Sequence, residues 1–400
     1  MDQRIAAIIS EFNPLHLGHK FLMDFARKNL RADRIIIIMS GCFTQRGIPA
    51  CLDKYDRAKT AIECGADLCV ELPVIASTAC AEIFAKTGVS LALSLGTTDI
   101  VFGAEEADAR LFSDVAEFLS YETESFREAL KASQKSGLTY PLSMKKALDG
   151  TEKNVSLLDS PNNMLGLMYV KALKDKALCF HAVKRTGKGH AYKLIDHSGF
   201  SSSLSIRNAL KENNIASALS QMPFESGSIL EEKYNKRQLV FEDDMSELLH
   251  LKLFENEDFT LFSDVTEDLS NRILSLRDEF LSFSSFAALL KSKNFTLSRI
   301  TRALLHILLD IKNEDVKALE KTGFSPYVHI LAMKKGAAEL LRNVKIPLFA
   351  SISEKKGLSP EAEILFKKDR LAYDIYRILL TKKTGRSFKN ESSRKFELIE

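Results

Sequence analysis

The chain has 400 residues, of which 45% are hydrophobic and 27% charged, a composition typical of soluble globular proteins. Its length suffices for about two or three domains. No stretch of about 18 uncharged apolar residues occurs, which excludes a membrane-spanning helix, and the first residues lack the pattern of a secretory signal. The six cysteines form no C-x-x-C pair, so we expect reduced thiols in a cytoplasmic protein rather than a zinc ribbon or a catalytic thiol.

The net charge of +3 is distributed unevenly along the chain. Residues 341–400 hold 14 basic and 8 acidic side chains, so this segment carries +6 and the rest of the chain −3. Such a run is typical either of a solvated tail or of a surface that contacts a polyanion such as RNA. The basic side chains are densest at Lys382, Lys383, Arg386, Lys389, Arg394 and Lys395.

Strand and helix patterns alternate along the first half of the chain. Short apolar or β-branched runs predict strands at 5–9, 34–39, 68–72, 99–102 and 178–183. Helical spacing predicts helices that open at 21 and span 53–64, 79–95, 161–177 and 203–211, with further helical structure over 111–148. The alternation predicts an α/β fold, in which right-handed crossovers build a parallel sheet that helices cover on both faces.

Beyond about residue 220 the strand patterns largely vanish. The polar segment 217–231 contains a proline and a glycine and is the predicted boundary between an α/β domain, 1–220, and a mainly α-helical domain, 221–400. Helices are predicted in the second domain at 244–256, 265–277, 283–293, 297–312, 331–342 and 360–381.

The most informative segment is 10–20, which directly follows the first predicted strand and opens the first helix. His16 and His19 stand three residues apart, so they share one face of the first helical turn, and Gly18 between them permits close approach of a ligand. A strand-to-helix junction of this kind holds phosphate in α/β proteins. We therefore predict a nucleotide site with imidazoles on phosphate oxygens. Metal binding by this pair is disfavoured because no carboxylate ligand follows it. The interpretation as ordinary surface histidines does not explain Pro14 and Gly18.

Four further side chains are candidate phosphate contacts. Ser203 and Ser205 lie at another helix start, where they serve either phosphate binding or N-capping. Arg207 falls in the first turn of that helix, where the dipole disfavours a cation unless an anion is present. Arg46 belongs to the loop after the second strand and is a candidate cation facing substrate.

Several motifs carry a resemblance to a known family. The pattern Asn13-Pro14-x-His16-x-Gly18-His19 resembles the H-x-G-H nucleotidyltransferase superfamily. Within it, the chain resembles the bacterial tRNA(Met) cytidine acetate ligases, closely over the first 215 residues and more loosely beyond. The segments that carry this narrower resemblance are 10–14, 39–47, 65–73, 102–105, 161–166 and 184–187.

The resemblance implies a Rossmann-like nucleotidyltransferase domain and an ATP-dependent ligase. Acetate is expected to attack the α-phosphate of ATP, with Mg²⁺ bridging phosphates, to give acetyl-adenylate and pyrophosphate. The acetyl group is then expected to pass to N4 of the wobble cytidine, position 34, of elongator tRNA(Met), forming N4-acetylcytidine. Domain 1–220 is expected to bind ATP and domain 221–400 to contact the tRNA. Neither a resident metal site nor a membrane partner is expected, and no oligomeric state is predicted.

His16 and His19 are the predicted catalytic residues. The alternative interpretation of Gly103 is an ordinary turn glycine. Asn162 is alternatively a helix cap, with Asn163 as its competitor for the contact with ATP. Arg185 is alternatively part of a surface ion pair. The chain departs from the family pattern at Cys42, where asparagine is expected. The ATP site of the family maps onto Ala7, Ile8, Ile9, Ser10, Glu11, Phe12, Asn13, Pro14, Leu15, His16, Leu17, Gly18, His19, Lys20, Gly103, Asn162 and Arg185.

Two other functions remain as alternatives. A small-molecule adenylyltransferase of coenzyme synthesis needs only the α/β unit, so the helical second half and its basic end argue against it. A non-catalytic nucleotide-sensing or RNA-binding protein has no need of an intact His16-x-Gly18-His19, which is present here.

Overall fold

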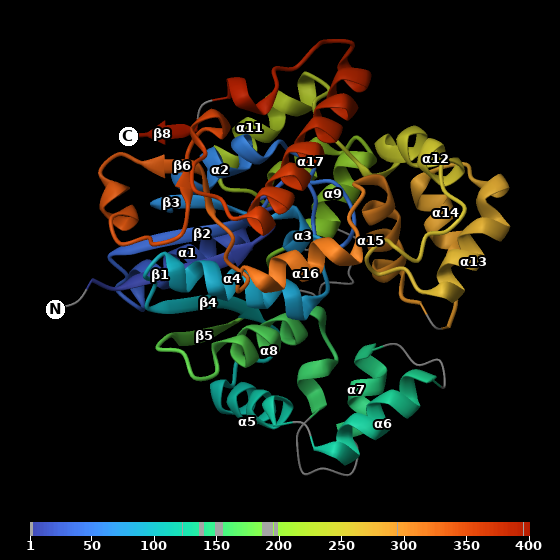
Figure 1. Cartoon of the computed structure of the whole chain (residues 1–400). Coiled ribbons are helices and arrows are strands. Elements are labelled where there is room, and N and C mark those ends of the chain that lie inside the picture. Colours follow the sequence, from blue (N-terminus) through green and yellow to red (C-terminus); the bar gives the residue numbers. More distant parts are fainter. Residues whose placement is uncertain are drawn as a thin grey trace.

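A computed structural model of the chain confirms the predicted α/β fold (Figure 1). No helix among its described residues is both long and apolar enough to cross a membrane. The structure describes residues 3–121, 123–135, 140–148, 155–185, 195, 199–293, 295–394 and 396–400.

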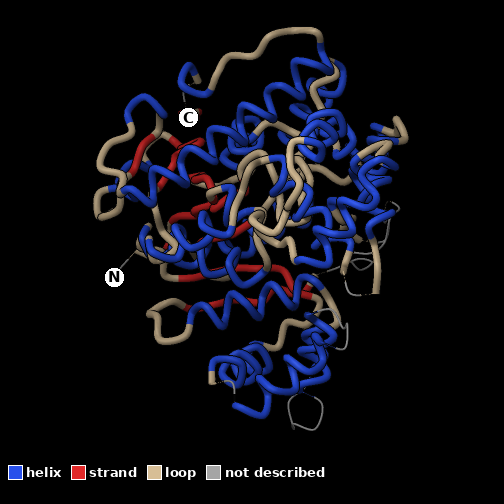
Figure 2. The backbone as a smooth tube through the Cα atoms, turned by 45° about the vertical axis from the view of Figure 1, so that its right-hand side comes forward, coloured by secondary structure: helices blue, strands red, loops and turns tan. Residues whose placement is uncertain are grey.

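One eight-stranded sheet forms the centre of the molecule, with strand order β5-β4-β1-β2-β3-β6-β7 and β8 paired to β6. Strands β1 to β5 are parallel, whereas β6 runs antiparallel to β3. The strands are β1 (Ile5–Ser10), β2 (Arg34–Ser40), β3 (Leu68–Leu72), β4 (Asp99–Ala104), β5 (Cys179–Lys184), β6 (Val328–Lys334), β7 (Leu348–Phe349) and β8 (Glu397–Ile399). Figure 2 shows these strands together, surrounded by helices.

The order of the strands creates a topological switch point. From β1 the chain builds outward through β2 and β3, and then returns to place β4 and β5 on the other side of β1. Right-handed crossovers put α1 (Leu17–Lys28) and α2 (Lys54–Glu63) on one face and α4 (Ala81–Ser94) and α8 (Pro161–Leu173) on the other. Figure 1 shows α4 and α8 in front of the sheet. The crevice between the carboxyl ends of β1 and β4 is where open α/β sheets bind ligands.

The sheet is buried on both faces, as the composition of its strands requires. The isoleucine run of β2 is fully enclosed from Ile35 to Ile38, which is typical of a central parallel strand. Beyond β4 the helices α5, α6 and α7 form a lobe at the β5 edge of the molecule (Figure 1), and they confirm helical structure in the described part of 111–148. They span Ala109–Ser120, Glu124–Lys135 and Tyr140–Leu148, and α3 spans Val74–Ser77.

The second half is mainly helical, as predicted. Five of its predicted helices match described helices, whereas α16 was not predicted. The helices are α9 (Ser203–Lys211), α10 (Ile215–Leu219), α11 (Phe224–Asn235), α12 (Ser246–Phe254), α13 (Glu267–Leu276), α14 (Phe283–Leu290), α15 (Leu297–Leu308), α16 (Asn313–Lys321) and α17 (Pro360–Thr384).

One helix prediction for the second half is wrong, and the segment of the predicted domain boundary is helical. The expected helix over 331–342 is instead the end of β6 followed by a short 3-10 helix, because its apolar run pairs with the edge of β3; a short apolar run does not distinguish strand from helix. The segment 217–231 is not a linker, since α10 and α11 occupy it and pack against each other, and α11 also packs against α2. Strands from both sides of residue 220 therefore share one sheet.

Candidate nucleotide site

A cavity opens at the switch point, beside the carboxyl ends of β1 and β4. Its wall includes Ser10 at the end of β1, Glu11 directly after it, Gly103 near the end of β4, and the start of α8 at Asn162. His16 and His19 from the first turn of α1 also face it. The fold therefore assembles lining residues from Ile8 to Arg207, about 200 positions apart in the sequence, at the place where the crevice rule predicts a ligand.

The two histidines form a reciprocal cap on α1. Nδ1 of His16, the N-cap residue, accepts a hydrogen bond from the amide of Gly18 at 3.1 Å. Nδ1 of His19 accepts one from the amide of His16 at 3.2 Å, and the rings stack with centroids 3.8 Å apart. Because each Nδ1 accepts, the hydrogen of each neutral ring lies on Nε2. The local fold thus holds the two imidazoles in the tautomer that carries its hydrogen on Nε2.

His19 is held neutral in the free protein. Burial lowers its pKa to about 3, and the nearby positive charge of Arg185 acts in the same direction. The edge of the Phe12 ring also packs against the His19 ring, with centroids 4.9 Å apart. A neutral imidazole donates a hydrogen bond without carrying a fixed charge, and a bound polyanion favours its protonation.

Gly18 is required by close packing rather than by its backbone angle. A Cβ atom at this position would lie 3.0 Å from Cε1 and 3.1 Å from Nδ1 of His16. A larger residue therefore requires the His16 ring to shift by a few tenths of an ångström. The sequence analysis explained this glycine by ligand access, and the close contact with His16 is a second reason for it.

Three arginines add positive charge to the same cavity: Arg46, Arg185 and Arg207. Arg207 is 5% exposed and donates from Nη1 to the carbonyl of Asn13 at 2.7 Å. Burial lowers the pKa of Arg207, and repulsion from Arg46 contributes in the same direction. Burial also lowers the pKa of Arg185, whose nearest carboxylate is Glu105 at 3.8 Å. Burial and mutual repulsion disfavour these charged guanidinium groups, so the cavity favours a polyanionic ligand that compensates their charge.

The structure narrows the predicted run 7–20. The residues of this run that line the cavity are Ile8, Ile9, Ser10, Glu11, Phe12, His16 and His19. Ala7, Pro14, Leu15 and Leu17 do not line it. Asn13 also points elsewhere, because its carboxamide donates to the carbonyl of Pro49 and accepts from the amide of Cys51.

Lys20 and Gly18 lie beside the cavity rather than in it. Lys20 forms an ion pair with Asp24 on the same helix, so its position is set by a neighbour one turn away. Gly18 lines a small adjoining cleft together with Gly103 and Arg185. Only part of a strand and of a helix turn faces any one cavity, so the cavity includes part of the run 7–20, and the assignment of the whole run to ATP stays a prediction.

The two asparagines at the start of α8 have different roles. Asn162 lines the cavity, and its Nδ2 donates to Oε1 of Glu105 at 2.6 Å. Asn163 is buried and accepts from the amide of Glu106. Neither caps α8, because Ser160 is its N-cap.

The two candidate serines of α9 also differ. Ser203 lines the cavity, whereas the hydroxyl of Ser205 lies 2.8 Å from that of Ser202, the N-cap of α9. Residues 186–189, which directly follow Arg185, lie outside the described residues. The departure at Cys42 does not reach the cavity; this thiol is buried, and burial raises its pKa.

Sequence reasoning missed two polar groups of the cavity wall. The hydroxyl of Tyr169 and Nε2 of Gln45 are buried and have no hydrogen-bond partner among the described residues. A buried polar group without a partner is costly and points to a ligand that satisfies it. Tyr169 gave no signal because it sits within an apolar helical pattern that reads as core.

A buried arginine outside the cavity shapes its mouth. Arg57 donates from Nη1 to the carbonyls of Glu11 and Ser40, at 2.7 and 3.0 Å, and from Nη2 to the carbonyl of Gly41. These carbonyls follow β1 and end β2, so one guanidinium ties the carboxyl ends of the two strands together.

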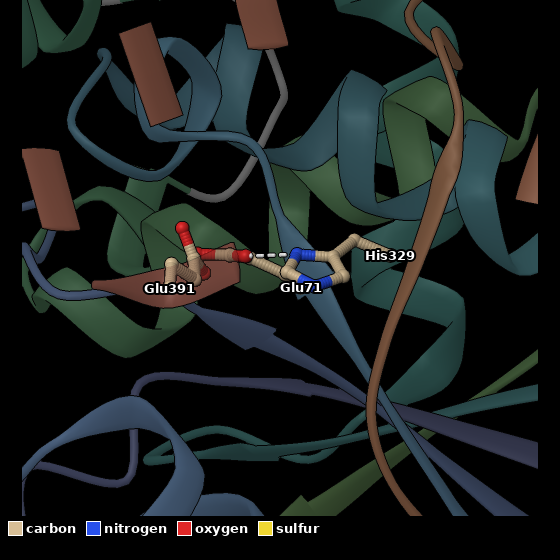
Figure 3. Close-up of side chains that lie close together, drawn as sticks. All are labelled: Glu71, His329 and Glu391. Atoms are coloured by element: carbon tan, nitrogen blue, oxygen red, sulfur yellow. Dashed lines mark hydrogen bonds and ion pairs between the residues drawn. The ribbon is translucent and has the colours of Figure 1, made fainter. Parts of the chain in front are cut away.

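A second polar cluster lies in the core, away from this cavity. Figure 3 shows Glu71, His329 and Glu391 converging, with Nδ1 of His329 directed at Glu71 at 2.6 Å. Their potential ligand atoms lie within 4.8 Å of one another, the arrangement among the described residues that most resembles a metal site. However, the ammonium of Lys54 lies 2.7 Å from Glu71 and also pairs with Glu391, so it supplies the positive charge there.

The basic C-terminal segment is partly neutralised by distant acids. Lys382 pairs with Glu247 and Lys383 with Asp244, at 2.5 and 2.7 Å. Arg394 lies 3.3 Å from Asp53 and is half-buried. At least these three cations therefore fasten the end of the chain to the rest of the molecule. Lys395 lies outside the described residues.

Comparison with known proteins defines the class of this fold and site. The profile of the HIGH Nucleotidyl Transferase family matches residues 3–391, nearly the whole chain. The apo crystal structure of Thermotoga maritima TmcAL superposes with a TM-score of 0.92 at 27% identity, covering 99% of this chain and 100% of that one. A structure of the same protein bound with alpha-thio ATP gives a TM-score of 0.90 at 26% identity with the same coverage.

Curated relatives narrow the class further. The tRNA(Met) cytidine acetate ligase of Caldanaerobacter subterraneus subsp. tengcongensis is 33% identical over 383 residues, covering 93% of this chain and 94% of that protein. The tRNA(Met) cytidine acetate ligase of Fervidobacterium nodosum is 32% identical over 411 residues, covering 96% of each. The chain belongs to the tRNA(Met) cytidine acetate ligase family of ATP-dependent ligases, which confirms the resemblance of its motifs.

Proposed function

We propose that this protein activates acetate with ATP and transfers the acetyl group to N4 of the wobble cytidine of elongator tRNA(Met). The observation that carries the first step is the cavity in which two imidazoles and three arginines face one another. This excess of donors and positive charge is complementary to a triphosphate. The relatives named for this reaction, and the relative bound with alpha-thio ATP, support the same substrate.

In the first step a carboxylate oxygen of acetate attacks the α-phosphorus of ATP. A new P–O bond forms, the bond to the β-phosphate oxygen breaks, and pyrophosphate leaves with the electron pair. Acetate is already ionised at neutral pH, so no general base is needed. Nε2 of His16 and of His19 donates to oxygens whose charge grows in the transition state, and Arg185, Arg207 and Arg46 hold the phosphates.

The cavity also fits a magnesium ion that arrives with ATP. Glu11 is the carboxylate on the described part of its wall, and Oε1 of Glu11 accepts from the amide of Gln45 at 2.8 Å. Mg²⁺ is usually held by one or two carboxylates plus phosphates. When bound it neutralises phosphate charge, while the imidazoles and arginines act as described above.

In the second step N4 of cytosine attacks the carbonyl carbon of acetyl-adenylate. The N–C bond forms, the C–O bond to the phosphate breaks, AMP leaves with the electron pair, and N4 loses a proton to solvent. The products are N4-acetylcytidine and AMP. A wobble base is accessible because it lies in a single-stranded loop. Residues 221–400 are proposed to contact the tRNA.

The test is acetylation of an unmodified elongator tRNA(Met) transcript with ATP and labelled acetate, followed by nucleoside analysis. We expect labelled N4-acetylcytidine that requires both ATP and acetate, and a rate about 100 to 1000 times lower for His19→Ala. The control transcript carries uridine at the wobble position and remains unlabelled. Absence of acetylated nucleoside from the unmodified transcript overturns the proposal.

The same assay separates the alternatives. ATP turnover with a small coenzyme precursor and without RNA product indicates a small-molecule adenylyltransferase. ATP binding without turnover of any kind indicates a non-catalytic nucleotide-binding protein. The intact His16-Gly18-His19 arrangement and the three cavity arginines favour turnover.

A further inference from the structure

A second cavity adjoins the nucleotide cavity and shares two of its arginines. Arg46 and Arg207 line both. The second cavity has a volume of about 400 Å³ and lies among α9, α14, α15 and the loop that follows β2. It therefore bridges the predicted boundary between residues 1–220 and 221–400. Nothing in the activation of acetate requires it.

Its wall combines an apolar surface with an electropositive rim. Ile48, Leu204 and Leu297 supply part of the apolar surface, and Phe283 and Ala287 form a buried floor. This volume and lining suit a flat, partly apolar group such as a nucleobase.

Three helices begin at this cavity. Leu204, Ser284 and Ser298 are each the second residue of their helix, α9, α14 and α15, and all three line it. The amino ends of helices carry partial positive charge. At α14 the amides of Phe283 and Ser284 already donate to the hydroxyl of Ser246 and the carboxylate of Asp243. The starts of α9 and α15 therefore add to Arg46 and Arg207, so the rim favours a phosphate on the ligand.

The charge at the rim is not cancelled within the cavity. Glu242 is the one carboxylate on its described lining, and it pairs with Lys211. The Arg46 guanidinium makes no hydrogen bond or ion pair with a described residue. Among the described residues, the side chain of Arg207 donates a hydrogen bond only to the neutral carbonyl of Asn13. Two guanidinium groups thus remain at the junction of the two cavities.

The loop that carries Arg46 is fixed in place. The hydroxyl of Thr301 on α15 donates to the carbonyl of Arg46 at 2.6 Å. Gly47 has a φ of +69°, and a Cβ there would lie 2.3 Å from the backbone of Thr301 and Arg302. Only glycine fits between loop and helix, so the second half of the chain positions an arginine of the nucleotide site.

We propose that the second cavity is the acceptor site, which receives the target cytidine of the RNA with its phosphate at the helix starts and its base toward the shared arginines. The inference rests on the proposed function. In this placement N4 faces the activated acetyl group across Arg46 and Arg207, so the two half-reactions use adjoining cavities. The rim would hold the phosphates that flank the target cytidine in RNA, so it would favour RNA over a free nucleotide, which lacks these flanking phosphates.

The test separates the half-reactions in one set of variants. Ser298→Trp places a bulky side chain at an exposed position of the cavity mouth. We expect acetate-dependent pyrophosphate exchange within about twofold of wild type, and acetyl transfer to tRNA lower by about 100-fold. Ala288→Trp, at an exposed position of α14 outside the cavity lining, is the matched control and should keep both activities within about twofold.

A second variant and a direct measurement guard against misfolding. Ser298→Glu adds a negative charge in the first turn of α15, where a carboxylate favours the helix. It should keep exchange and lower transfer about tenfold by repelling the RNA phosphate. In wild-type protein, an anticodon stem-loop with 5-iodocytidine at the wobble position should crosslink, on irradiation, to the first turns of α14 or α15.

Two outcomes overturn the inference, and they are distinguishable. If wild type shows exchange and transfer but both Ser298 variants transfer acetyl within twofold of it, or if the crosslinks map elsewhere, the acceptor site is wrong while the proposed function stands. If wild type shows no acetate-dependent exchange, the proposed function fails and the inference fails with it.

Discussion

Two buried polar clusters of this protein differ in their charge balance. In the core, Glu71 and Glu391 meet Lys54 and His329, so opposite charges lie within the cluster. Burial alone would raise the pKa of Glu71, but Lys54 and His329 outweigh it and bring that pKa to about 2. At the nucleotide cavity positive charges face one another instead. The comparison teaches that charge imbalance, rather than buried polarity, marks a ligand site.

The core cluster should govern stability. Lys54→Met removes the ammonium between two buried carboxylates, and leaving such charges unpaired costs about 3–5 kcal/mol in the free energy of unfolding. Urea denaturation measures this. Lys59→Met on the same helix, where the ion pair with Glu63 is exposed and 3.8 Å long, is the control and should cost less than about 1 kcal/mol. A loss in the free energy of unfolding below about 1 kcal/mol for Lys54→Met would contradict the role of this ammonium in balancing the two buried carboxylates.

The cavity charge should govern activity. Arg46→Met removes an unpaired guanidinium, so the free energy of unfolding should change by less than about 0.5 kcal/mol. The lost contact with phosphate should lower acetate-dependent pyrophosphate exchange about 10- to 100-fold, as expected for a charged hydrogen bond. Arg110→Met, at an exposed position of α5, serves as control. Unchanged exchange in Arg46→Met would show that this arginine does not face the triphosphate.

The neutral state of His19 gives a pH signature. Below the usual pKa of 6.5 the unfolded chain protonates this imidazole, whereas the folded protein does so only near pH 3. The unfolded state therefore binds more protons, and stability falls as pH decreases through this window. We expect His19 to account for about 1–2 kcal/mol of the loss between pH 7 and pH 5, with the ring half-buried.

Urea denaturation of wild type and His19→Gln at both pH values isolates this contribution. The variant should lose less stability on acidification by that amount. Saturating ATP should reduce the pH dependence of the wild type, since the triphosphate favours the protonated ring. Equal pH dependence in the two proteins would mean that His19 is accessible to protons in the folded state.

Substitution of Gly18 tests whether the position of the His16 ring affects activity independently of stability. In Gly18→Ala the new methyl group meets the His16 ring, while alanine favours the helix by about 1 kcal/mol. Exchange activity should fall about three- to tenfold without loss of stability. Gly96→Ala is a poor match because of its positive φ, so Ser94→Ala at a half-buried position of α4, away from the cavity, is the better control. Full activity in Gly18→Ala would show that the His16 position is not critical.

The sequence revealed those parts of the site that local patterns encode. His16, Gly18 and His19 follow one strand within a few residues. Arg207 was predicted in a first helical turn, but it is the fifth residue of α9 and lies in the second turn, so the helix dipole does not explain its place at the cavity. Tyr169 and Gln45 were missed because their unpaired atoms become visible only when four distant segments meet. The run of basic residues near the C-terminus was likewise incomplete evidence for an RNA-binding surface.

The errors in the fold have the same cause. β6 was read as helix because its pairing partner, β3, lies more than 250 residues away. The basic end of the chain was a candidate RNA surface, but Lys382, Lys383 and Arg394 pair with acids far away in sequence. Long-range pairing is absent from any local pattern.

The measurement that tests the central claim most directly is exchange of labelled pyrophosphate into ATP, with and without acetate, for wild type, His19→Ala and Lys59→Met. The account predicts exchange that depends on acetate in wild type and in Lys59→Met, and a rate about 100 to 1000 times lower in His19→Ala. Exchange without acetate, or full exchange by His19→Ala, would contradict the assignment of the imidazole pair to acetate activation.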